Sequence, residues 1–229
     1  MRCILLAAGL GTRLSPLTLS TPKCLLPVQG RPLLQWWLRH LERHGCTDMR
    51  INTHHLAQQV EAFVRAYAGP IRVRTVYEVD LLGSAGTLRR NRDFFPVGEP
   101  VLVANADNLT NVDLTALVEG HLSWHRPLTL GIFQPEDLRR TGVVELGADN
   151  CIVGFEEKPP KPRGHWANGG LYVMDGRAVD ALVADDPADI AKDLVPWWLG
   201  RATGIPVQGY LRDIGTPASY AAAQEDWMA

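Results

Sequence analysis

The chain opens with a short apolar segment that runs directly into a glycine-rich loop, and this feature constrains the fold most. Residues 2–7 read RCILLA, which is typical of a short buried strand, and glycines follow at once. Residues 31–45 have apolar side chains at helical spacing and stop at Gly45, and residues 49–55 predict a second strand. A strand, a helix and a second strand form a βαβ unit, which places the two strands parallel in one sheet.

The same alternation continues along the first part of the chain. The pattern predicts a helix over 56–67, strands over 71–78, 101–105 and 128–133, and a helix over 113–125 with Asp113 as its N-cap. Repeated βαβ units indicate an α/β fold with a Rossmann-like, mainly parallel mixed sheet flanked by helices.

The pattern becomes strand-rich after about residue 134. Short strands are expected at 142–146, 151–157 and 169–175, with helices at 190–199 and 217–227 around one further short strand near 205–211. We expect one domain over 1–229, with a regular half at about 1–134 and a second half at about 135–229 that covers a ligand.

Composition restricts the classes of function. The 229 residues are 46% hydrophobic, which is enough for a full core. The net charge is −2 and both signs are scattered along the chain without a basic patch, which argues against nucleic acid and anionic membranes as main partners. The four cysteines form no CxxC pair, no leader pattern precedes Cys3, and no apolar run approaches the ~20 residues of a membrane span. We expect a cytoplasmic protein with reduced thiols and a small ligand.

The glycine loop matches neither common phosphate-binding motif. A dinucleotide fingerprint needs G-x-G-x-x-G, but Leu14 stands where the third glycine belongs, and the P-loop pattern is absent. Gly9 and Gly11 still leave backbone N–H groups free to cradle phosphate oxygens, and Thr12 adds a hydroxyl. The missing glycine argues against a nicotinamide dehydrogenase.

Two cations flank this loop. Arg13 offers a planar fork for a di- or triphosphate, and Lys23 offers a point charge for another phosphoryl group. The pair favours phosphoryl or nucleotidyl transfer, and the alternative is a simple turn with two solvated charges.

With these residues the chain resembles the sugar-1-phosphate nucleotidyltransferases. The resemblance is carried by LAAGLGTRL at 6–14, PLT at 16–18, TPK at 21–23 and LPV at 26–28. It implies that Arg13 acts on the departing pyrophosphate and that Lys23 lies near the reacting phosphates and the sugar phosphate. It also implies nucleotide contacts from Ala7, Ala8, Gly9, Gly11, Thr12, Arg13, Glu78, Gly83, Ser84 and Asn105.

The family resemblance also implies a Mg²⁺ site. Transfer between two anionic phosphates requires their repulsion to be neutralised, and carboxylates with phosphate oxygens suit Mg²⁺. Asp107 follows the predicted strand 101–105, and Asp213 lies in LRDIGTP; both match acidic positions that the family uses for Mg²⁺. The family usually has Gly-Asp where this chain has Ala106-Asp107, which we expect to reshape the site slightly.

Base and sugar recognition follow from the same resemblance. Glu78 stands where the family places a base-contacting side chain, and a carboxylate accepts two N–H bonds from guanine but one from uracil or thymine. We therefore favour GTP. TGVVEL, FEEKP and ANGGLYV resemble sugar-site elements. They imply that Gly142 packs on the ring, Glu157 accepts hydroxyls, Lys158 binds the sugar phosphate and Asn168 bonds the sugar or its phosphate.

The expected reaction converts an NTP and a sugar 1-phosphate into an NDP-sugar and pyrophosphate. The chain looks most like the compact guanylyltransferases that act on manno-configured hexose or heptose 1-phosphates, without the C-terminal β-helix of longer members. Uridylyl- or thymidylyltransferases and a non-catalytic nucleotide-sugar sensor stay as alternatives, and a homodimer stays open. His121 and His125 are spaced i, i+4, but they lack a metalloprotease pattern, so we expect a solvated helix face.

Overall fold

The computed structural model of the protein describes residues 1–183 and 189–228 and contains two compact units. The first unit comprises Met1–Leu81, Ala104–Val112 and Gly209–Ala229, and the second comprises Leu82–Val103 and Asp113–Gln208. Both units draw on both expected halves of the chain, because residues after 208 return to the first unit. Whether 1–229 acts as a single domain stays a prediction.

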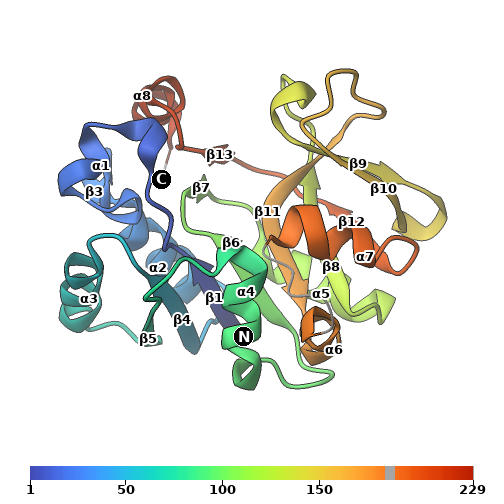
Figure 1. Ribbon diagram of the computed structural model, residues 1–229, viewed down its shortest axis with the longest axis horizontal. Coiled ribbons are helices and arrows are strands. Elements are labelled where there is room, and N and C mark those ends of the chain that lie inside the picture. Colours follow the sequence, from blue (N-terminus) through green and yellow to red (C-terminus); the bar gives the residue numbers. More distant parts are fainter. Residues whose placement is uncertain (184–188, 229) are drawn as a thin grey trace. The chain divides into compact units, whose positions relative to one another are not determined.

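Parallel strands form the centre of the first unit. β1 (Arg2–Leu6), β4 (Asp48–Thr53) and β5 (Arg72–Tyr77) pair in parallel in the order β1-β4-β5. α2 (Leu33–Arg43) buries seven of its residues and α3 (Ala57–Ala66) follows β4, so the predicted βαβ units are present (Figure 1). Cys3, Ile4 and Leu5 of β1 are completely buried, as a strand covered on both faces requires.

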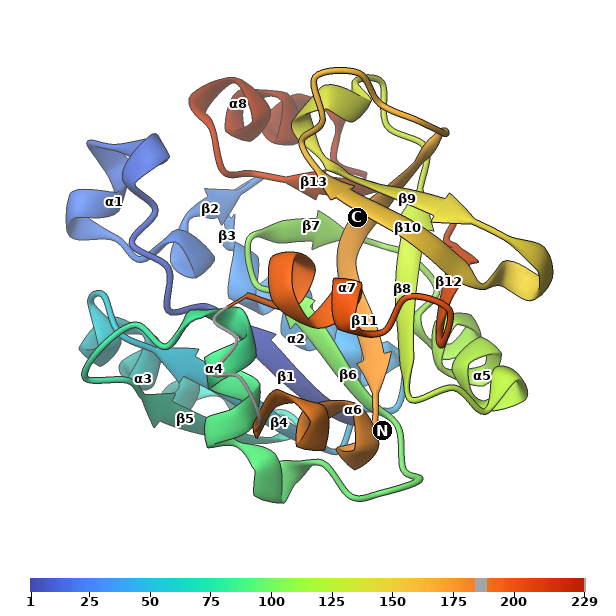
Figure 2. The same cartoon turned by 45° about the vertical axis from the view of Figure 1, so that its right-hand side comes forward.

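The glycine loop and the C-terminal segment complete the first unit. The loop contains the short helices η1 (Thr12–Leu14), α1 (Leu17–Ser20) and η2 (Lys23–Leu25), followed by the β2 (Pro27–Val28) and β3 (Arg31–Pro32) hairpin. β7 (Asn108–Thr110) pairs antiparallel with β13 (Leu211–Asp213), and α8 (Pro217–Asp226) follows β13 (Figures 1 and 2).

The second unit is mainly antiparallel. β11 (Trp166–Met174) pairs with β8 (Leu128–Phe133) and β9 (Gly142–Leu146), β9 pairs with β10 (Ile152–Glu157), and β12 (Ala202–Pro206) adds to β8 in parallel. Its α-helices are α4 (Gly83–Arg90), α5 (Leu114–Trp124), α6 (Gly176–Asp180) and α7 (Val195–Trp197). Its 3₁₀ turns are η3 (Arg92–Phe94), η4 (Leu138–Arg140), η5 (Ala148–Asn150) and η6 (Ala181–Val183), and η7 (Ile190–Leu194) is a π-helix. β6 (Val101–Asn105) runs from this unit into the first.

The predicted fold class, a mixed Rossmann-like sheet flanked by helices, is confirmed. Asp113 caps α5 through Ala116 N–H, as expected. The prediction was wrong at two places. Residues 202–213 form two strands where one was expected, and the helix expected at 190–199 begins as the π-helix η7 and ends as the short α7. Pro196 has no N–H to donate to the preceding turn, which interrupts regular α-helix there.

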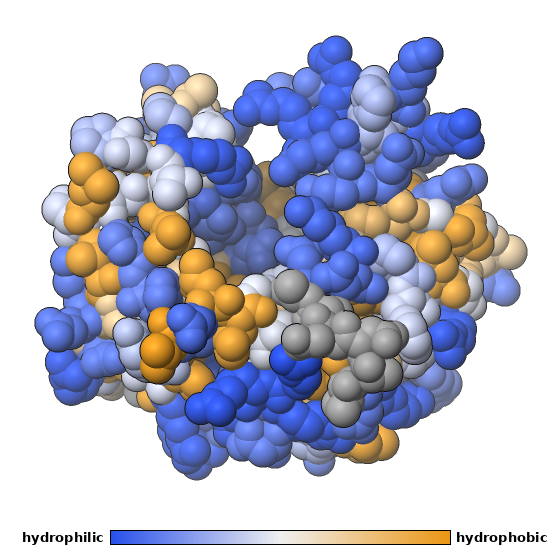
Figure 3. Space-filling view, in the orientation of Figure 1, coloured by the Kyte–Doolittle hydropathy of each residue, from blue (hydrophilic) through white to orange (hydrophobic). Residues whose placement is uncertain are grey.

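Polar residues cover much of the face seen in Figure 3, and apolar atoms lie at the position of α1. Leu17 and Leu19 of α1 are 45% and 70% exposed. No helix among the described residues combines the length and apolarity needed to cross a bilayer.

His121 lies in the core of the second unit, so the expectation of a solvated face was wrong for this residue. Its Nδ1 is 2.9 Å from Thr129 Oγ1, and it is 4% exposed. Burial lowers the pKa of His121 to about 4, because a charged imidazole is costly where water is excluded. His121 is therefore neutral in the folded protein at neutral pH.

This lowered pKa predicts an acid-labile core. The unfolded chain takes up a proton at His121 near pH 6.5 whereas the folded chain does not. The folding free energy that this residue contributes is therefore complete above pH ~6.5 and falls by up to about 1.4 kcal/mol per pH unit down to about pH 4. We expect His121→Gln to flatten the pH dependence of urea unfolding in that window relative to the parent. His125→Asn, at an exposed left-handed position, serves as the control and should not change the slope.

Candidate functional site

A cavity opens at the end of β1, where the parallel strands of the first unit present their carboxyl edge. It has a volume of about 200 Å³. Its lining residues are Leu6, Ala7, Gly9, Lys23, Cys24, Asn105, Ala106 and Asp107. Five of these were predicted as site residues from the sequence (Ala7, Gly9, Lys23, Asn105 and Asp107). The glycine loop and the end of β6 thus meet at one cavity, as a ligand-binding strand edge requires.

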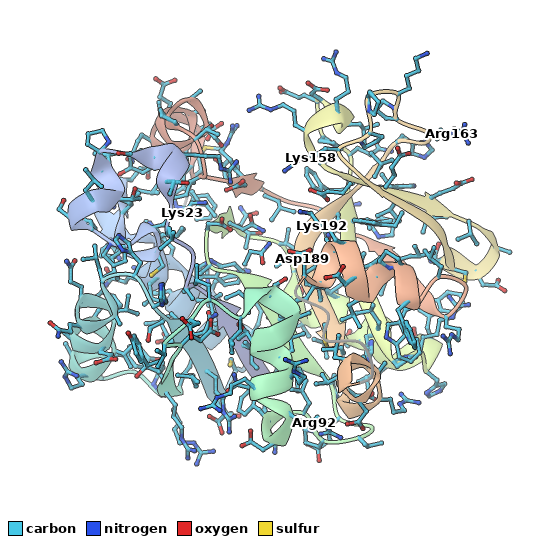
Figure 4. The ribbon with its side chains drawn as sticks, in the orientation of Figure 1. Lys23, Arg92, Lys158, Arg163, Asp189 and Lys192 are labelled. Carbon is cyan, nitrogen blue, oxygen red and sulfur yellow. The ribbon has the colours of Figure 1, made fainter. Side chains whose placement is uncertain are left out.

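Lys23 connects two segments that are far apart in the sequence. Its Nζ lies 2.5 Å from Asp107 Oδ2 and 3.2 Å from Asp213 Oδ1. The Lys23 side chain is 11% exposed, whereas Asp107 and Asp213 are 31% and 49% exposed. Both predicted metal-binding carboxylates therefore share one ammonium group. Lys23 lies on the loop after β1 (Figure 4).

Arg13 lies at the outer side of the same cluster. Its Nη2 is 3.8 Å from Asp213 Oδ2, and its side chain is 62% exposed, which leaves most of the guanidinium open to solvent.

Gly11 has a φ of 66°, and a Cβ there would meet the Thr18 side chain at 2.8 Å. The tight turn that presents Thr12 and Arg13 therefore needs glycine at position 11.

Gly215 belongs to this cluster and was not predicted from the sequence. A Cβ at this position would lie 2.7 Å from Asp213 Oδ1, 2.8 Å from Arg13 Nη2 and 2.9 Å from Lys23 Nζ. The backbone thus forms a wall against which three charged groups pack. The sequence signal was present in the run Asp213-Ile214-Gly215-Thr216-Pro217, but only the fold shows what the glycine contacts.

We expect Gly215→Ala to lower activity while leaving thermal stability almost unchanged. The crowded atoms are the ends of flexible side chains and can move aside at small cost, so we expect a melting temperature within about 2 °C of the parent. The displaced charges leave their working positions, so kcat/KM should fall about tenfold to a hundredfold. Steady-state kinetics and thermal unfolding on one preparation test this, and unchanged kcat/KM would show that the wall has no catalytic importance.

The two carboxylates fit a magnesium site in their chemistry. Mg²⁺ prefers hard oxygen ligands and is often bound by one or two carboxylates together with substrate phosphates and water. No group of three or more potential side-chain ligands occurs among the described residues, so the other ligands would have to come from substrate and solvent. Ala106 is buried at the wall of this cavity, and its N–H donates to the Leu6 carbonyl. The slight reshaping of the site expected from Ala106 stays a prediction.

Cys24 lines the cavity but is not a reactive nucleophile. Its thiol is 2% exposed, and burial raises its pKa to about 12, with a further contribution from the nearby Asp107 charge. A neutral, buried thiol attacks poorly. The chemistry of this cavity rests on charges and backbone groups.

Glu78 is held by a neighbouring strand. Its side chain is 3% exposed, and its Oε1 accepts a hydrogen bond of 3.0 Å from Asn52 Nδ2. Asn52 Oδ1 in turn accepts from Ala7 N–H at 2.6 Å, so Asn52 connects Glu78 to the start of the glycine loop. The sequence analysis missed Asn52, and the base contact of Glu78 stays a prediction.

The predicted sugar-site residues lie in the second unit. Gly142 and Glu157 are paired across β9 and β10, and a Cβ at Gly142 would lie 2.9 Å from Glu157 Oε2. Lys158 Nζ is 3.5 Å from Glu157 Oε1, and the loop that carries Lys158 also carries Arg163 (Figure 4). Gly142 is buried, and a Cβ there would also lie 2.6 Å from the Phe155 ring, so a carboxylate, a cation and an aromatic ring neighbour this glycine.

Asn168 and Ser84 make hydrogen bonds within the second unit. Asn168 Nδ2 donates to Tyr172 Oη at 2.7 Å, and its Oδ1 accepts from Gly170 N–H at 3.0 Å. Ser84 Oγ accepts from Ile190 N–H at 2.8 Å. Gly83 has a φ of 72° at the first residue of α4, a conformation that favours glycine. The ligand contacts predicted for these residues stay predictions.

The fold is that of an α/β protein with a phosphate-type loop: a glycine-rich loop follows the first strand and carries a lysine that two carboxylates share. The chain belongs to the nucleotidyl transferase family, whose model matches residues 2–229.

Named relatives and solved structures agree with this family. The chain is 29% identical over 224 residues to the mannose-1-phosphate guanylyltransferase catalytic subunit beta of Drosophila melanogaster, covering 96% of this chain and 60% of that protein. It is 28% identical over 211 residues to a UTP–glucose-1-phosphate uridylyltransferase of Synechocystis, covering 86% of this chain and 54% of that protein.

A structure described as a glucose-1-phosphate thymidylyltransferase from Bacillus anthracis superposes with a TM-score of 0.87 at 26% identity, covering 100% of this chain and 97% of that one. The chain thus spans about 60% of the length of the Drosophila relative, but nearly all of the Bacillus chain.

Proposed function

We propose that the protein transfers a nucleotidyl group from an NTP, with GTP favoured, to a sugar 1-phosphate, with a manno-configured hexose or heptose favoured. The observation that carries this proposal is the Lys23 ammonium, which is shared by Asp107 and Asp213 at the end of a glycine loop in a nucleotidyl transferase chain. One cation among two carboxylates beside free backbone N–H groups suits a reaction between two anionic phosphates. We also propose a cytoplasmic location. Whether the protein forms a homodimer stays an open question.

The proposed step is an in-line displacement. A sugar-phosphate oxygen forms a bond to the α-phosphorus while the bond from that phosphorus to the oxygen bridging to the β-phosphate breaks, and the electron pair leaves with pyrophosphate. No protein nucleophile is required, and no proton has to move. The work of the protein is to position the reactants and to neutralise charge.

The residues of the first unit divide this work. Backbone N–H groups of the glycine loop and the Thr12 hydroxyl hold phosphate oxygens. Arg13, which is mostly exposed, is free to pair with the departing pyrophosphate. Lys23 holds the reacting phosphates together. Asp107 and Asp213 would hold Mg²⁺, which when bound supplies positive charge to the phosphate oxygens.

The second unit supplies the proposed sugar contacts. Glu157 accepts sugar hydroxyls, Lys158 binds the sugar phosphate, Gly142 packs on the ring, and Asn168 orients the sugar or its phosphate. The pairing of Gly142 with Glu157 and the short distance from Glu157 to Lys158 support this grouping. A neutral polyol bearing a phosphate needs this combination of acceptor and cation.

Two observations support a second nucleotide choice. The Synechocystis relative is named for UTP and the Bacillus structure for thymidylyl transfer, so a uridylyl- or thymidylyltransferase acting on a hexose or amino-sugar 1-phosphate is the alternative. The guanylyl choice is supported by the name of the Drosophila relative and by the carboxylate of Glu78.

The deciding experiment is pyrophosphate release by the purified protein with Mg²⁺. GTP, UTP, dTTP, CTP and ATP are each tested against a panel of hexose and heptose 1-phosphates. Release with GTP and a manno-configured 1-phosphate supports the proposal in full. Release with UTP or dTTP alone keeps the reaction and overturns the base. No release with any pair, while nucleotide sugars still bind, moves the assignment to a sensor.

A further inference from the structure

Lys23 and Asp213 approach each other from opposite ends of the chain. They are separated by 190 positions, yet Lys23 Nζ lies 3.2 Å from Asp213 Oδ1. Neither segment is part of the central parallel strands: Lys23 begins the short turn η2, and Asp213 ends the three-residue strand β13. The pairing of β13 with β7 holds Asp213 beside Asn108, so the separation of Lys23 and Asp213 depends on what holds the loop that carries Lys23 against β13.

Helix α8 contacts β13 and also β2, the short strand that follows η2. Its N-cap Thr216 accepts from Ser219 N–H through Oγ1, and the Ser219 hydroxyl donates to the carbonyl of Asp213. This fixes the first turn of the helix to the residue that carries the carboxylate. Figure 2 shows α8 beside β13.

The middle of the same helix is bonded to the end of the glycine loop. The Pro27 carbonyl, four residues after Lys23, accepts from Tyr220 Oη at 2.6 Å and from Gln224 Nε2 at 2.7 Å. Tyr220 and Gln224 are spaced i, i+4, so both reach this carbonyl from one face of the helix. A carbonyl oxygen has two lone pairs, and both are used here.

Gln224 is bonded at both ends of its amide. Its Oε1 accepts from Gln29 N–H at 2.8 Å while its Nε2 donates to Pro27, which determines the orientation of the amide. Gln29 Nε2 in turn donates to the Trp227 carbonyl at 2.5 Å. The β2–β3 hairpin is thus bound to the helix by a closed set of hydrogen bonds rather than by one contact.

We propose that Tyr220 and Gln224 are positioning residues for the reaction, acting through Pro27 on the loop that carries Lys23. One helix bonded to Asp213 at its start and to Pro27 beyond its first turn sets the distance between the two halves of the charge cluster. The proposal rests on the proposed function, because it assigns to α8 the geometry of Lys23 and Asp213. Neither side chain touches the reacting atoms.

The test compares Gln224→Met, Gln224→Glu and Tyr220→Phe with the parent and with Glu225→Met. Met keeps the size of Gln224 but removes both hydrogen bonds, and Glu keeps the acceptor for Gln29 while it loses the donor to Pro27. Glu225 is exposed and neighbours Gln224 on the same helix, which makes Glu225→Met the matched control. Tyr220→Phe removes a single hydroxyl and secures the test if Gln224→Met folds poorly.

We expect Gln224→Met to lower kcat about tenfold to a hundredfold with the KM for sugar 1-phosphate within about twofold, and to raise the Mg²⁺ concentration needed for half-maximal rate. Gln224→Glu and Tyr220→Phe should show smaller losses of the same kind. Glu225→Met should match the parent. A merely structural role would lower the melting temperature and the active fraction without changing the Mg²⁺ requirement.

Hydrogen exchange gives a readout that does not depend on activity. Backbone amides of residues 23–26 and 28 should exchange faster in Gln224→Met than in Glu225→Met. Equal exchange and equal kcat in these two variants would overturn the proposal. If the parent releases no pyrophosphate with any substrate pair, the proposed function fails, and the exchange result still decides whether α8 orders the loop.

Discussion

Asp107→Asn is expected to lower kcat at least about 1000-fold, equivalent to about 4 kcal/mol of transition-state stabilisation, while the protein stays folded. Asn has the size of Asp and still accepts a hydrogen bond from Lys23, but it lacks the negative charge that Mg²⁺ requires from its ligand. Pyrophosphate release under saturating Mg²⁺ measures the loss, and calorimetric titration of Mg²⁺ in the presence of nucleotide should show weaker binding.

The control for this variant is Asp149→Asn. Asp149 is exposed in the second unit at a positive φ of 54°, a conformation that Asn adopts readily, so activity and stability should both be retained. A kcat close to that of the parent in Asp107→Asn would remove Asp107 from the metal site.

Lys23→Met is expected to lower kcat about a hundredfold to a thousandfold without loss of Mg²⁺ binding. The change removes the cation that holds the phosphates, yet leaves both carboxylates in place with no ammonium between them. Two facing carboxylates repel each other, and a divalent cation relieves that repulsion. Metal titration should therefore give equal or tighter Mg²⁺ binding, the opposite of the result for Asp107→Asn.

Arg65→Met is the matched loss of a cation. Arg65 is 70% exposed on α3 and pairs with Glu61 at 3.8 Å, a surface pair that contributes only a few tenths of a kcal/mol. Its kcat should equal that of the parent. If Lys23→Met lost Mg²⁺ binding together with activity, Lys23 would be needed to build the metal site rather than to neutralise the phosphates.

The contrast between these two variants follows from one geometric fact. Asp107 and Asp213 share the Lys23 ammonium, and the mostly exposed Arg13 adds a weaker contact to Asp213, so the charges of this cluster are paired before any substrate arrives. A variant that removes a carboxylate and a variant that removes the ammonium shift this balance in opposite directions. Activity alone does not separate them, but metal affinity does.

Much of the secondary structure could be predicted from local sequence. The apolar run before the glycines predicts β1, the spacing of 31–45 predicts α2, and Asp113 marks the start of α5. These signals are local, because helix periodicity, capping and glycine conformation act over a few residues. The loop residues Gly9, Arg13 and Lys23 were predicted for the same reason: they lie in one short motif.

Tertiary structure alone decided which distant groups meet. Gly215 as a wall for three charged side chains, Asn52 between Ala7 and Glu78, and the bonds from α8 to Pro27 all join segments far apart in the chain. His121 shows the same limit, because its helical spacing suggested a solvated face while packing placed it in the core. By itself the sequence determined most of the longer strands and helices and the phosphate-type loop, since these depend on neighbouring residues. Contacts between distant segments depend on how those elements pack, and only the folded chain specifies them.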